Sequence, residues 1–230
     1  MIDRLDDPEG AIPKIVHIVL PDWEKTKPVV RAMIADQMLA RPNHEFWIWS
    51  DEACDALVLK HCSKRQQDAY FSINRQYGPA IADFARYVIM YVYGGEYQDA
   101  KSGFVNPEKR KHFHPFAPLI VIHWGRALQL EKIHNDPLNR GEICNWILMS
   151  AKGHDIWQKV LNQICDIIEL RQSAAGWGQG KQEVLEVTGP VMMTIVMNEE
   201  LQYYHHQRVS ANAQIGVEYD ILGDHQKMQN

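Results

Sequence analysis

Segments typical of strands and of helices alternate over the first 60 residues of this chain. The runs KIVHIVL (14–20) and HEFWIWSD (44–51) predict two strands. Between them, PVVRAMIADQMLA (28–40) has helical spacing and begins at a proline, which suits the first turn of a helix. Ser50 or Asp51 can cap the helix that follows the second strand. Because such alternation builds βαβ units, we predict an α/β fold with a largely parallel sheet.

The rest of the chain continues this alternation less regularly. GPAIADFARYVIMYVYGG (78–95) predicts a helix that ends at Gly94-Gly95, because glycine accepts a positive φ. Further predictions are strands at 96–99 and 119–124, two helices within 143–170 broken around Lys152-Gly153-His154, a helix at 189–200, and weak strands after residue 206, the last at 216–222. No linker or repeat divides the chain, so residues 1–230 are expected to form one domain with 1–11 and 224–230 as loose tails.

Composition excludes several classes of function. The 24 basic and 29 acidic residues give a net charge of −5, whereas a protein that coats nucleic acid needs a basic surface. The acidic N-terminus lacks the features of a signal peptide, and the run YVIMYVYGG is too short to span a bilayer. Four scattered cysteines favour buried thiols in a reducing compartment over disulfides or a zinc site. We therefore expect a cytoplasmic protein without a transmembrane segment.

Two charged residues, Asp83 and Arg86, interrupt the apolar helix predicted at 78–95. A separation of three residues corresponds to about 300° of rotation, so the two side chains lie on one face of the helix. No solvated stripe of charges accompanies them. The pair therefore forms a structural ion bridge or lines a pocket, and the spacing alone leaves both interpretations open.

Asp99 follows the glycine pair, at the end of the strand predicted at 96–99. Ligands of open α/β sheets bind beyond the carboxyl ends of strands, which makes Asp99 a candidate binding residue. An aspartate in this position can equally form a turn by bonding nearby backbone amides.

The segment ADFARYVIMYVYGGEYQDAKSG resembles the signature of glycosyltransferase family 32, which includes DXD-type sugar-binding transferases and capsular polysaccharide synthesis enzymes. The family pattern is A-D-x-x-R-x-x-x-L-x-x-x-G-G-x-Y-x-D-x-D, and it is met at Ala82, Asp83, Arg86, Gly94, Gly95, Tyr97 and Asp99. Further elements agree in order: IPKIVH (12–17), FWIWSDE (46–52), CNWILMSAKGHDIW (144–157) and VTGPVMMT (187–194). Together these elements make the resemblance specific.

This resemblance implies a GT-A type nucleotide-diphospho-sugar transferase fold, with a mixed central sheet flanked by helices, and a nucleoside-diphosphate sugar as donor. By analogy with the family, Asp83 and Arg86 contact the donor sugar, while Asp99 contacts the ribose and a metal-bound diphosphate. These three residues are the predicted catalytic residues. A departing diphosphate develops negative charge, which Mg²⁺ or Mn²⁺ normally neutralises by bridging carboxylate and phosphate oxygens.

The second aspartate of the family's D-x-D is replaced, since the motif here reads Asp99-Ala100-Lys101. Either Lys101 binds near the donor diphosphate and partly replaces the metal, or it points away and Asp99 holds a metal with a group from elsewhere. Asp224 and His225 are the candidate metal ligands, because GT-A proteins commonly supply a late-chain ligand. The alternative for this segment is a frayed tail. The family's late H-x-x-x-S-W motif is not visible.

Other residues are predicted to complete the donor site. His17 packs under the nucleotide, either as a contact or as a core histidine, and Tyr97 belongs to the family motif. The family often has a tryptophan shortly after this histidine. Here Leu20 occupies that region, so base stacking is assigned to Trp49 or Trp23.

Fewer residues of the sequence indicate where an acceptor would bind. Trp124, at a predicted strand end, is a candidate stacking platform, with simple packing as the alternative. Asn145 reaches the acceptor or caps the core. The basic run EKRKHFH (108–114) is a solvated loop or a dock for an anionic acceptor or lipid phosphate, which would bring peripheral membrane contact.

The resulting hypothesis is a retaining glycosyltransferase that moves a sugar from a UDP- or GDP-sugar to a glycan or glycolipid acceptor, in surface or capsular polysaccharide synthesis. Retention is implied by the resemblance. No residue is an evident general base, and the departing phosphate is expected to take the acceptor proton. The alternatives are a non-catalytic nucleotide-sugar binding or scaffold protein with a degenerate motif, and a sugar-nucleotide hydrolase.

Overall fold

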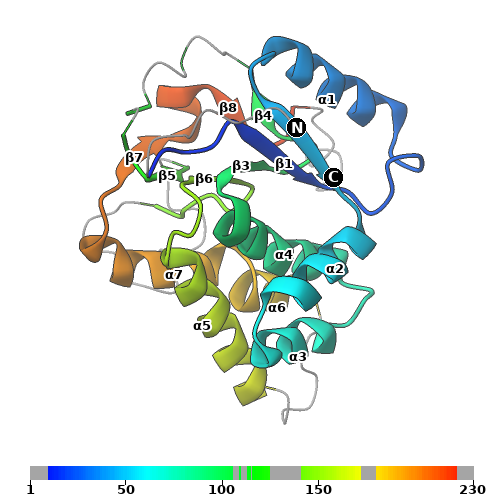
Figure 1. The fold of residues 1–230 in the computed structure, drawn as a ribbon, viewed down its shortest axis with the longest axis vertical. Helices are drawn as coiled ribbons and strands as arrows, with labels where there is room; N and C mark the ends of the chain where they lie inside the picture. Colours follow the sequence, from blue (N-terminus) through cyan, green and yellow to red (C-terminus); the bar gives the residue numbers. More distant parts are fainter. Residues whose placement is uncertain are drawn as a thin grey trace.

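A six-stranded sheet in the order β2-β1-β3-β6-β5-β7 forms the middle layer of the molecule (Figure 1). The structure, a computed structural model, describes residues 10–105, 109, 113–114, 116–124, 141–171 and 180–221. The strands of this sheet are β1 (Ile15–Val19), β2 (Glu45–Trp49), β3 (Gly95–Gln98), β5 (Leu119–His123), β6 (Ile147–Ser150) and β7 (Gln207–Ser210). A second, two-stranded sheet pairs β4 (Gly103–Phe104) with β8 (Val217–Glu218).

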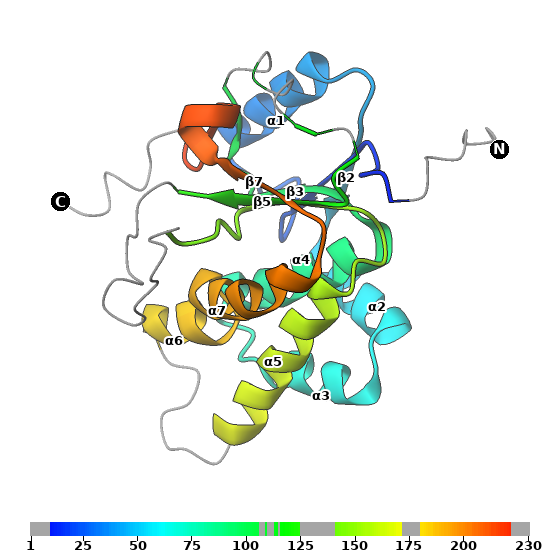
Figure 2. The same ribbon diagram turned by 90° about the vertical axis from the view of Figure 1, so that its left-hand side faces the viewer.

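Helices cover the two faces of the large sheet unequally (Figure 2). One face carries α2 (Asp51–His61), α3 (Lys64–Ser72), α4 (Gly78–Tyr93), α5 (Ile156–Arg171), α6 (Gly180–Val187) and α7 (Pro190–Glu200). The opposite face carries α1 (Pro28–Ala40) and the β4–β8 pair. Two short helices, η3 (Leu201–Tyr203) and the π-helix η4 (Ala211–Ile215), flank β7. The predicted mixed sheet flanked by helices is confirmed.

Strand directions divide the sheet into two parts. β1 runs parallel to β2 and β3, whereas β6 is antiparallel to both β3 and β5, and β5 is parallel to β7. His17 pairs with Trp47 on one side and with Tyr97 on the other. Because paired residues point to the same face, these three side chains form one row across the sheet.

The elements predicted over the first hundred residues are confirmed closely. α1 has the predicted bounds, and Ser50 caps α2 by accepting a hydrogen bond from the backbone N–H of Ala53 at 3.2 Å. The helix α3 was not predicted. It begins with a capping box, in which Ser63 and Gln66 each bond the other's backbone N–H.

The prediction of two helices within 143–170 is wrong in its first half. Ile147–Ser150 is the strand β6, and only Ile156–Arg171 is helical. All four residues of β6 are buried, and a short apolar run of this kind fits a buried strand as well as a helix. Pairing with β3 and β5 on its two sides decides the strand. The strand predicted at 216–222 is confirmed for Val217–Glu218 only.

Apolar side chains form a core on each face of the sheet. The largest core joins the sheet to α2, α3, α4, α5 and α7, and a second lies between the sheet and the β4, η4 and β8 segments. A third, smaller cluster packs β1 against α1. All four cysteines are free, and Cys54, Cys144 and Cys165 are buried, as expected for small apolar side chains. Among the described residues, none of the helices combines the length and the apolar composition that a bilayer crossing requires.

Candidate active site

Helix α4 carries two charged side chains into the interior of the protein. It has a proline in its first turn and is almost entirely apolar, which explains why it is buried along most of its length. The helix ends at Gly94, and the chain then enters β3 directly through Gly95. Asp83 and Arg86 on α4 are thereby placed beside the end of β3, where Asp99 follows.

The glycine pair at this junction is required by both conformation and space. Gly94 has a φ of +63° and Gly95 a φ of +93°, values that other residues rarely adopt. A Cβ atom on Gly94 would lie 2.4 Å from the backbone nitrogen of Lys152, and one on Gly95 would lie 2.6 Å from the carbonyl oxygen of Ile15. The close approach of these segments fixes where β3 starts.

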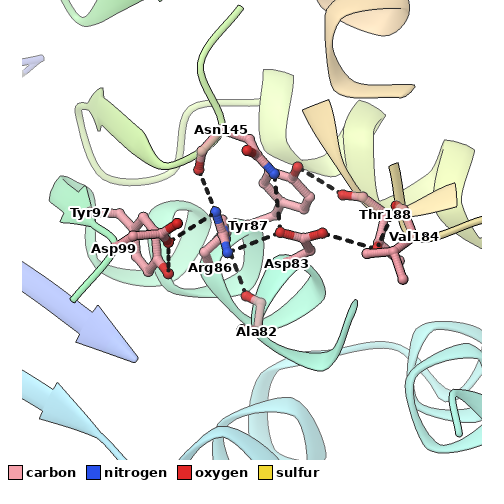
Figure 3. A network of polar contacts seen from close by, with 9 residues as sticks. All are labelled: Ala82, Asp83, Arg86, Tyr87, Tyr97, Asp99, Asn145, Val184 and Thr188. Carbon is pink, nitrogen blue, oxygen red and sulfur yellow. Dashed lines mark hydrogen bonds and ion pairs between the residues drawn. The ribbon is translucent and has the colours of Figure 1, made fainter. Parts of the chain in front are cut away.

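The Asp83 carboxylate is surrounded by donors. Asn145 Nδ2 donates to Oδ1 at 3.0 Å, and Thr188 Oγ1 donates to Oδ2 at 3.1 Å (Figure 3). Arg86 Nη2 lies 2.9 Å from Oδ1. Burial nevertheless raises the pKa of Asp83 to about 7, and the nearby Asp99 carboxylate acts in the same direction. Asp83 is therefore a buried carboxyl group that titrates close to neutral pH.

The Arg86 guanidinium connects three parts of the chain. Nη1 donates to the carbonyl oxygen of Asn145 at 2.6 Å and lies 3.3 Å from Asp99 Oδ1. The guanidinium carbon also lies 4.6 Å from the centre of the Tyr97 ring. Burial alone would lower the pKa of Arg86, but the surrounding Asp99, Tyr97 and Asp83 raise it above its ordinary value. Arg86 is therefore a permanent positive charge at the centre of the network.

Asp99 is the part of this network that reaches solvent. Its side chain is 28% exposed, against 7% for Asp83 and 6% for Arg86. Tyr97 Oη donates to Asp99 Oδ1 at 2.9 Å, and the backbone N–H of Asp99 donates to the carbonyl oxygen of Trp146 at 2.8 Å. A ligand that enters from solvent therefore meets Asp99 first and the buried pair behind it.

Asp83 and Arg86 form the ion pair that one of the two interpretations expects. The same pair is joined through Asp99 to the surface. A purely structural bridge needs only its own partner, whereas this one belongs to a network drawn from α4, the end of β3, the segment before β6 and the turn between α6 and α7 (Figure 3). Such a buried network with one open end is typical of a polar ligand site.

A mostly apolar pocket borders the opposite end of the network. It is lined by Ile73, Asn74, Tyr77, Ala80, Glu183, Val184, Val187 and Thr188. Among these lining residues there is no lysine or arginine. An anionic ligand group is therefore expected at the Asp99 end of the network rather than in this pocket.

The predicted donor residues His17 and Trp49 lie together in an aromatic cluster with Trp47 and Tyr93. His17 is fully buried, its Nδ1 accepts a hydrogen bond from Trp49 Nε1 at 3.2 Å, and its Nε2 lies 2.9 Å from the Gly94 carbonyl oxygen. Burial lowers the pKa of His17 to about 4, so the ring is neutral. This cluster adjoins the network through the shared row of His17 and Tyr97.

Lys101 stands in a tight turn directly after β3. The backbone N–H of Ser102 donates to the Asp99 carbonyl oxygen at 2.9 Å and closes the turn. The turn is tied to the C-terminal segment, because Ser102 Oγ donates to the Tyr219 carbonyl oxygen at 2.6 Å and Ile221 N to the Lys101 carbonyl oxygen at 3.0 Å. Asp99 and Lys101 are thus held side by side.

These residues do not fit the two-carboxylate metal site of a D-x-D motif. Only one carboxylate of the motif is present, and its Oδ1 already accepts from Tyr97 and faces Arg86. Within the described part of the chain, no group of three histidine, cysteine, aspartate or glutamate side chains is arranged to hold a metal ion. The predicted ligands Asp224 and His225 lie outside the described residues.

The two predicted acceptor residues are placed differently from one another. Trp124 packs against Trp146 and Tyr219, with ring centres 5.1 and 5.8 Å away, and is half-buried. Asn145 is not on a helix but in the segment before β6, and it contacts the Asp83 and Arg86 side chains. Asn145 therefore belongs to the same network as the predicted catalytic residues.

Sequence reasoning missed two contributors to this site. Thr188 lies in the VTGP element but had no assigned role, and it contacts Asp83 directly. Tyr219 had none either. Its carbonyl oxygen accepts from Ser102 Oγ in the turn that follows Asp99. Burial, and after it the Asp99 carboxylate, raise the pKa of the Tyr219 hydroxyl to about 12. The threonine of the T-G-P element is a signal that could have been used, whereas nothing in the sequence marked Tyr219.

Comparison with protein families gives this network its context. A family model described as "Glycosyltransferase sugar-binding region containing DXD motif" matches residues 29–109, the segment that holds Asp83, Arg86, Asp99 and Lys101. Over this segment the chain resembles the glycosyltransferases of the family 32 type. The resemblance expected from the motifs is thereby confirmed.

Two curated relatives agree with this resemblance. An "Initiation-specific alpha-1,6-mannosyltransferase" of Schizosaccharomyces pombe is 24% identical over 223 residues, which cover 89% of this chain and 54% of the relative. The protein of the same name from Candida albicans is 24% identical over 167 residues, covering 66% of this chain and 43% of the relative. The chain spans about half the length of the curated relatives it matches.

Among solved structures, the one titled "PaToxG Glycosyltransferase" superimposes with a TM-score of 0.57 at 14% identity. The match covers 84% of this chain and 71% of that chain. At this identity the likeness shows the fold alone, and the predicted GT-A type fold is confirmed.

Proposed function

We propose that this protein is a retaining glycosyltransferase that moves a hexose from a nucleoside-diphosphate sugar to a hydroxyl group of a glycan or glycolipid. The observation that carries the proposal is the buried Asp83–Arg86 pair, joined to the partly exposed Asp99 within the segment that matches the sugar-binding family. The ion pair is buried and is connected to solvent through the Asp99 carboxylate. Such an arrangement suits a ligand rich in hydroxyl and phosphate groups.

Each residue of the network has a role in this proposal. The Asp83 carboxylate accepts hydrogen bonds from the donor sugar, and Arg86 donates to the sugar or to the diphosphate. Asp99, the exposed member, contacts the ribose and the diphosphate side of the donor. Asn145 and Thr188 are positioning residues, because they act on the donor by orienting the Asp83 carboxylate.

The base of the donor nucleotide is assigned to the aromatic cluster of His17, Trp47, Trp49 and Tyr93. Trp49 is the candidate surface for the base, and the neutral His17 fixes the indole through its Nδ1. Tyr97 links this cluster to the reaction centre, since it pairs with His17 in the sheet and donates to Asp99. UDP- and GDP-sugars are the donors to test first.

The transfer step itself is a substitution at the anomeric carbon. The bond between that carbon and the β-phosphate oxygen breaks, and the departing nucleoside diphosphate keeps the electron pair. A new bond forms from the acceptor hydroxyl oxygen to the anomeric carbon on the same face. The proton of that hydroxyl passes to the departing phosphate oxygen, so no protein base is needed. Positive charge fixed near the leaving group lowers the barrier of this step.

The acceptor is assigned to the side of the network where Trp124, Trp146 and Tyr219 meet. Trp124 and Tyr219 are half-buried, and aromatic rings of this kind are surfaces on which sugar rings stack, which supports a glycan or glycolipid acceptor. The relatives are named for mannosyl transfer, and this supports a hexose as the transferred group. A role in surface polysaccharide synthesis in the cytoplasm, with peripheral membrane contact for a lipid-linked acceptor, completes the proposal.

Replacement of Asp99 tests the proposal. Purified wild-type protein and Asp99→Asn are incubated with UDP- and GDP-hexoses and an oligosaccharide acceptor panel, and glycosylated product is measured. We expect Asp99→Asn to lose at least about 100-fold in transfer rate, because a charge-assisted contact to the donor is removed. Thermal melting of the variant should stay close to wild type, since Asp99 is partly exposed.

The matched control is Asp68→Asn, an exposed carboxylate on α3 that pairs with Lys64. It should leave transfer unchanged. Full transfer by Asp99→Asn would contradict the assignment. Release of nucleoside diphosphate without any acceptor would favour the hydrolase alternative, and donor binding without either reaction would favour a non-catalytic binding protein.

A further inference from the structure

The replacement at position 101 changes the charge of the site by a definite amount. An aspartate there would carry a charge of −1, whereas the Lys101 ammonium group carries +1, so the difference is +2. A bound Mg²⁺ or Mn²⁺ ion brings the same +2 charge to a D-x-D site. A diphosphate that reaches this chain without any metal therefore meets the net charge of a metal-loaded D-x-D site.

Backbone hydrogen bonds fix the position of residue 101 relative to Asp99. The turn is closed by the Ser102–Asp99 hydrogen bond, and the Lys101 carbonyl oxygen accepts from the backbone N–H of Ile221. The Lys101 side chain is half-buried. Its Cα atom therefore cannot move away from Asp99 without breaking contacts on both sides of the turn.

The Asp99 carboxylate already has a cation beside it. Arg86 Nη1 lies 3.3 Å from Asp99 Oδ1, and Tyr97 Oη donates to that oxygen at 2.9 Å. A metal ion on Oδ1 would have to displace both contacts. These contacts make Oδ1 of Asp99 a poor metal ligand.

We propose that this protein binds the diphosphate of its donor without a divalent metal ion, with the Lys101 ammonium group supplying the charge that the metal supplies elsewhere. The inference rests on the proposed function for the identity of the ligand as a nucleoside diphosphate. Lys101 donates to the diphosphate oxygens as a point charge, and Arg86 offsets the negative charge of the neighbouring Asp99 carboxylate.

One rival arrangement is available in the described part of the chain. Asp220 lies next to Ile221, whose backbone N–H bonds Lys101, and its carboxylate adds to the negative field at Tyr219. A metal ion held by Asp99 and Asp220 together would make nucleotide binding depend on metal. The experiment therefore includes a variant that removes the Asp220 carboxylate.

The test is isothermal titration calorimetry of the full chain with UDP and with GDP, each in EDTA and in Mn²⁺. For the wild type we expect binding of at least one nucleotide, with a Kd that agrees within about threefold between the two conditions. Lys101→Gln should weaken binding about tenfold or more in EDTA, because a charge-assisted contact is lost. Lys101→Asp should bind poorly in EDTA and regain affinity in Mn²⁺, since it restores a D-x-D site.

Two controls separate the charge at position 101 from general effects. Lys64→Gln removes an exposed lysine on α3 and should leave both Kd values unchanged. The Asp220→Asn variant should bind nucleotide with similar Kd values in Mn²⁺ and in EDTA, as the wild type does. Melting of every variant by circular dichroism identifies any that fail to fold, and Lys101→Arg, which keeps the charge, should bind in EDTA even if Lys101→Asp is unstable.

Several results would overturn the inference. These are wild-type binding that EDTA abolishes and Mn²⁺ restores, binding in EDTA that survives Lys101→Gln unchanged, and no binding of either nucleotide in either condition. The outcome is separable from the proposed function. Metal-dependent binding together with glycosyl transfer refutes only the present inference, whereas metal-free binding without transfer refutes only the proposed activity.

Discussion

Arg86 follows Asp83 by one helical turn on α4, and its Nη2 atom lies 2.9 Å from the Asp83 carboxylate. Both side chains are buried, yet burial still raises the pKa of Asp83 to about 7 despite this partner. Ionisation of the Asp83 carboxyl group near neutral pH therefore costs the folded protein free energy.

Asp83→Asn should change how stability depends on pH. The pKa of Asp83 rises from 3.8 unfolded to about 7 folded, so the folded state binds more protons between these values. The free energy of unfolding contributed by Asp83 therefore falls as pH rises from about 4 to 7, by at most about 4 kcal/mol. Asp83→Asn removes this slope.

Urea denaturation of both proteins at pH 5, 6, 7 and 8 measures the effect. The difference in free energy of unfolding between Asp83→Asn and wild type should grow in favour of the variant up to pH 7 and then stay constant. Parallel stability curves across this range would mean that Asp83 is ionised throughout. Asp68→Asn, which alters an exposed carboxylate, serves as the control.

His17→Gln should remove an opposite slope at lower pH. The pKa of His17 falls from 6.5 unfolded to about 4 folded, so the unfolded state binds more protons in that window. Stability contributed by the neutral ring is lost as pH falls from about 6.5 to 4, by at most about 3 kcal/mol. Glutamine keeps an N–H for the Gly94 carbonyl oxygen but does not titrate. Its acid unfolding midpoint should lie at lower pH than that of the wild type, and an unchanged midpoint would contradict the buried neutral ring.

Thr188→Val should weaken donor binding by leaving Asp83 Oδ2 without its donor. The loss of one hydrogen bond to a buried acceptor costs about 1–3 kcal/mol of stability. The matched control is Thr194→Val on α7, because buried Thr194 Oγ1 accepts from the Ile143 backbone N–H at 3.0 Å. Both variants should melt at lower temperature, but only Thr188→Val should raise the KM for the donor. Equal KM values would show that Thr188 has only a structural role.

Gly94→Ala should be far more damaging than Gly153→Ala. Both glycines have a positive φ, of +63° and +71°, and share the backbone strain of about 1–2 kcal/mol that alanine suffers there. Only at Gly94 does the added Cβ meet backbone, at 2.4 Å from Lys152 N, whereas at Gly153 nothing lies within 4 Å. We expect Gly153→Ala to fold with a slightly lower melting temperature and Gly94→Ala to lose more than about 3 kcal/mol or not to accumulate. Similar melting temperatures would contradict the observed contact.

Local pattern predicted much of the first half of the fold. The apolar spacing of 28–40 and 78–95, the proline in the first turn of each helix and the glycine stop at Gly94 act within a few residues of sequence, so they can be seen without the tertiary structure. The run 147–150 could not be assigned in this way. Its continuous apolar character fits a helix or a buried strand, and only the pairing of β6 with β3 and β5 decides between them.

The sequence by itself determined the resemblance to a glycosyltransferase family, the placement of Asp83 and Arg86 on one helix face, and the replacement of a carboxylate by Lys101. These are properties of residue type and of spacing along one segment. Tertiary structure decided that Asn145 and Thr188 complete the Asp83 environment and that Tyr219 bonds the turn after Asp99. These partners are separated from the motif by between 62 and 120 positions in the chain, and only the packing of α4 against the sheet and α7 brings them within hydrogen-bond or electrostatic reach.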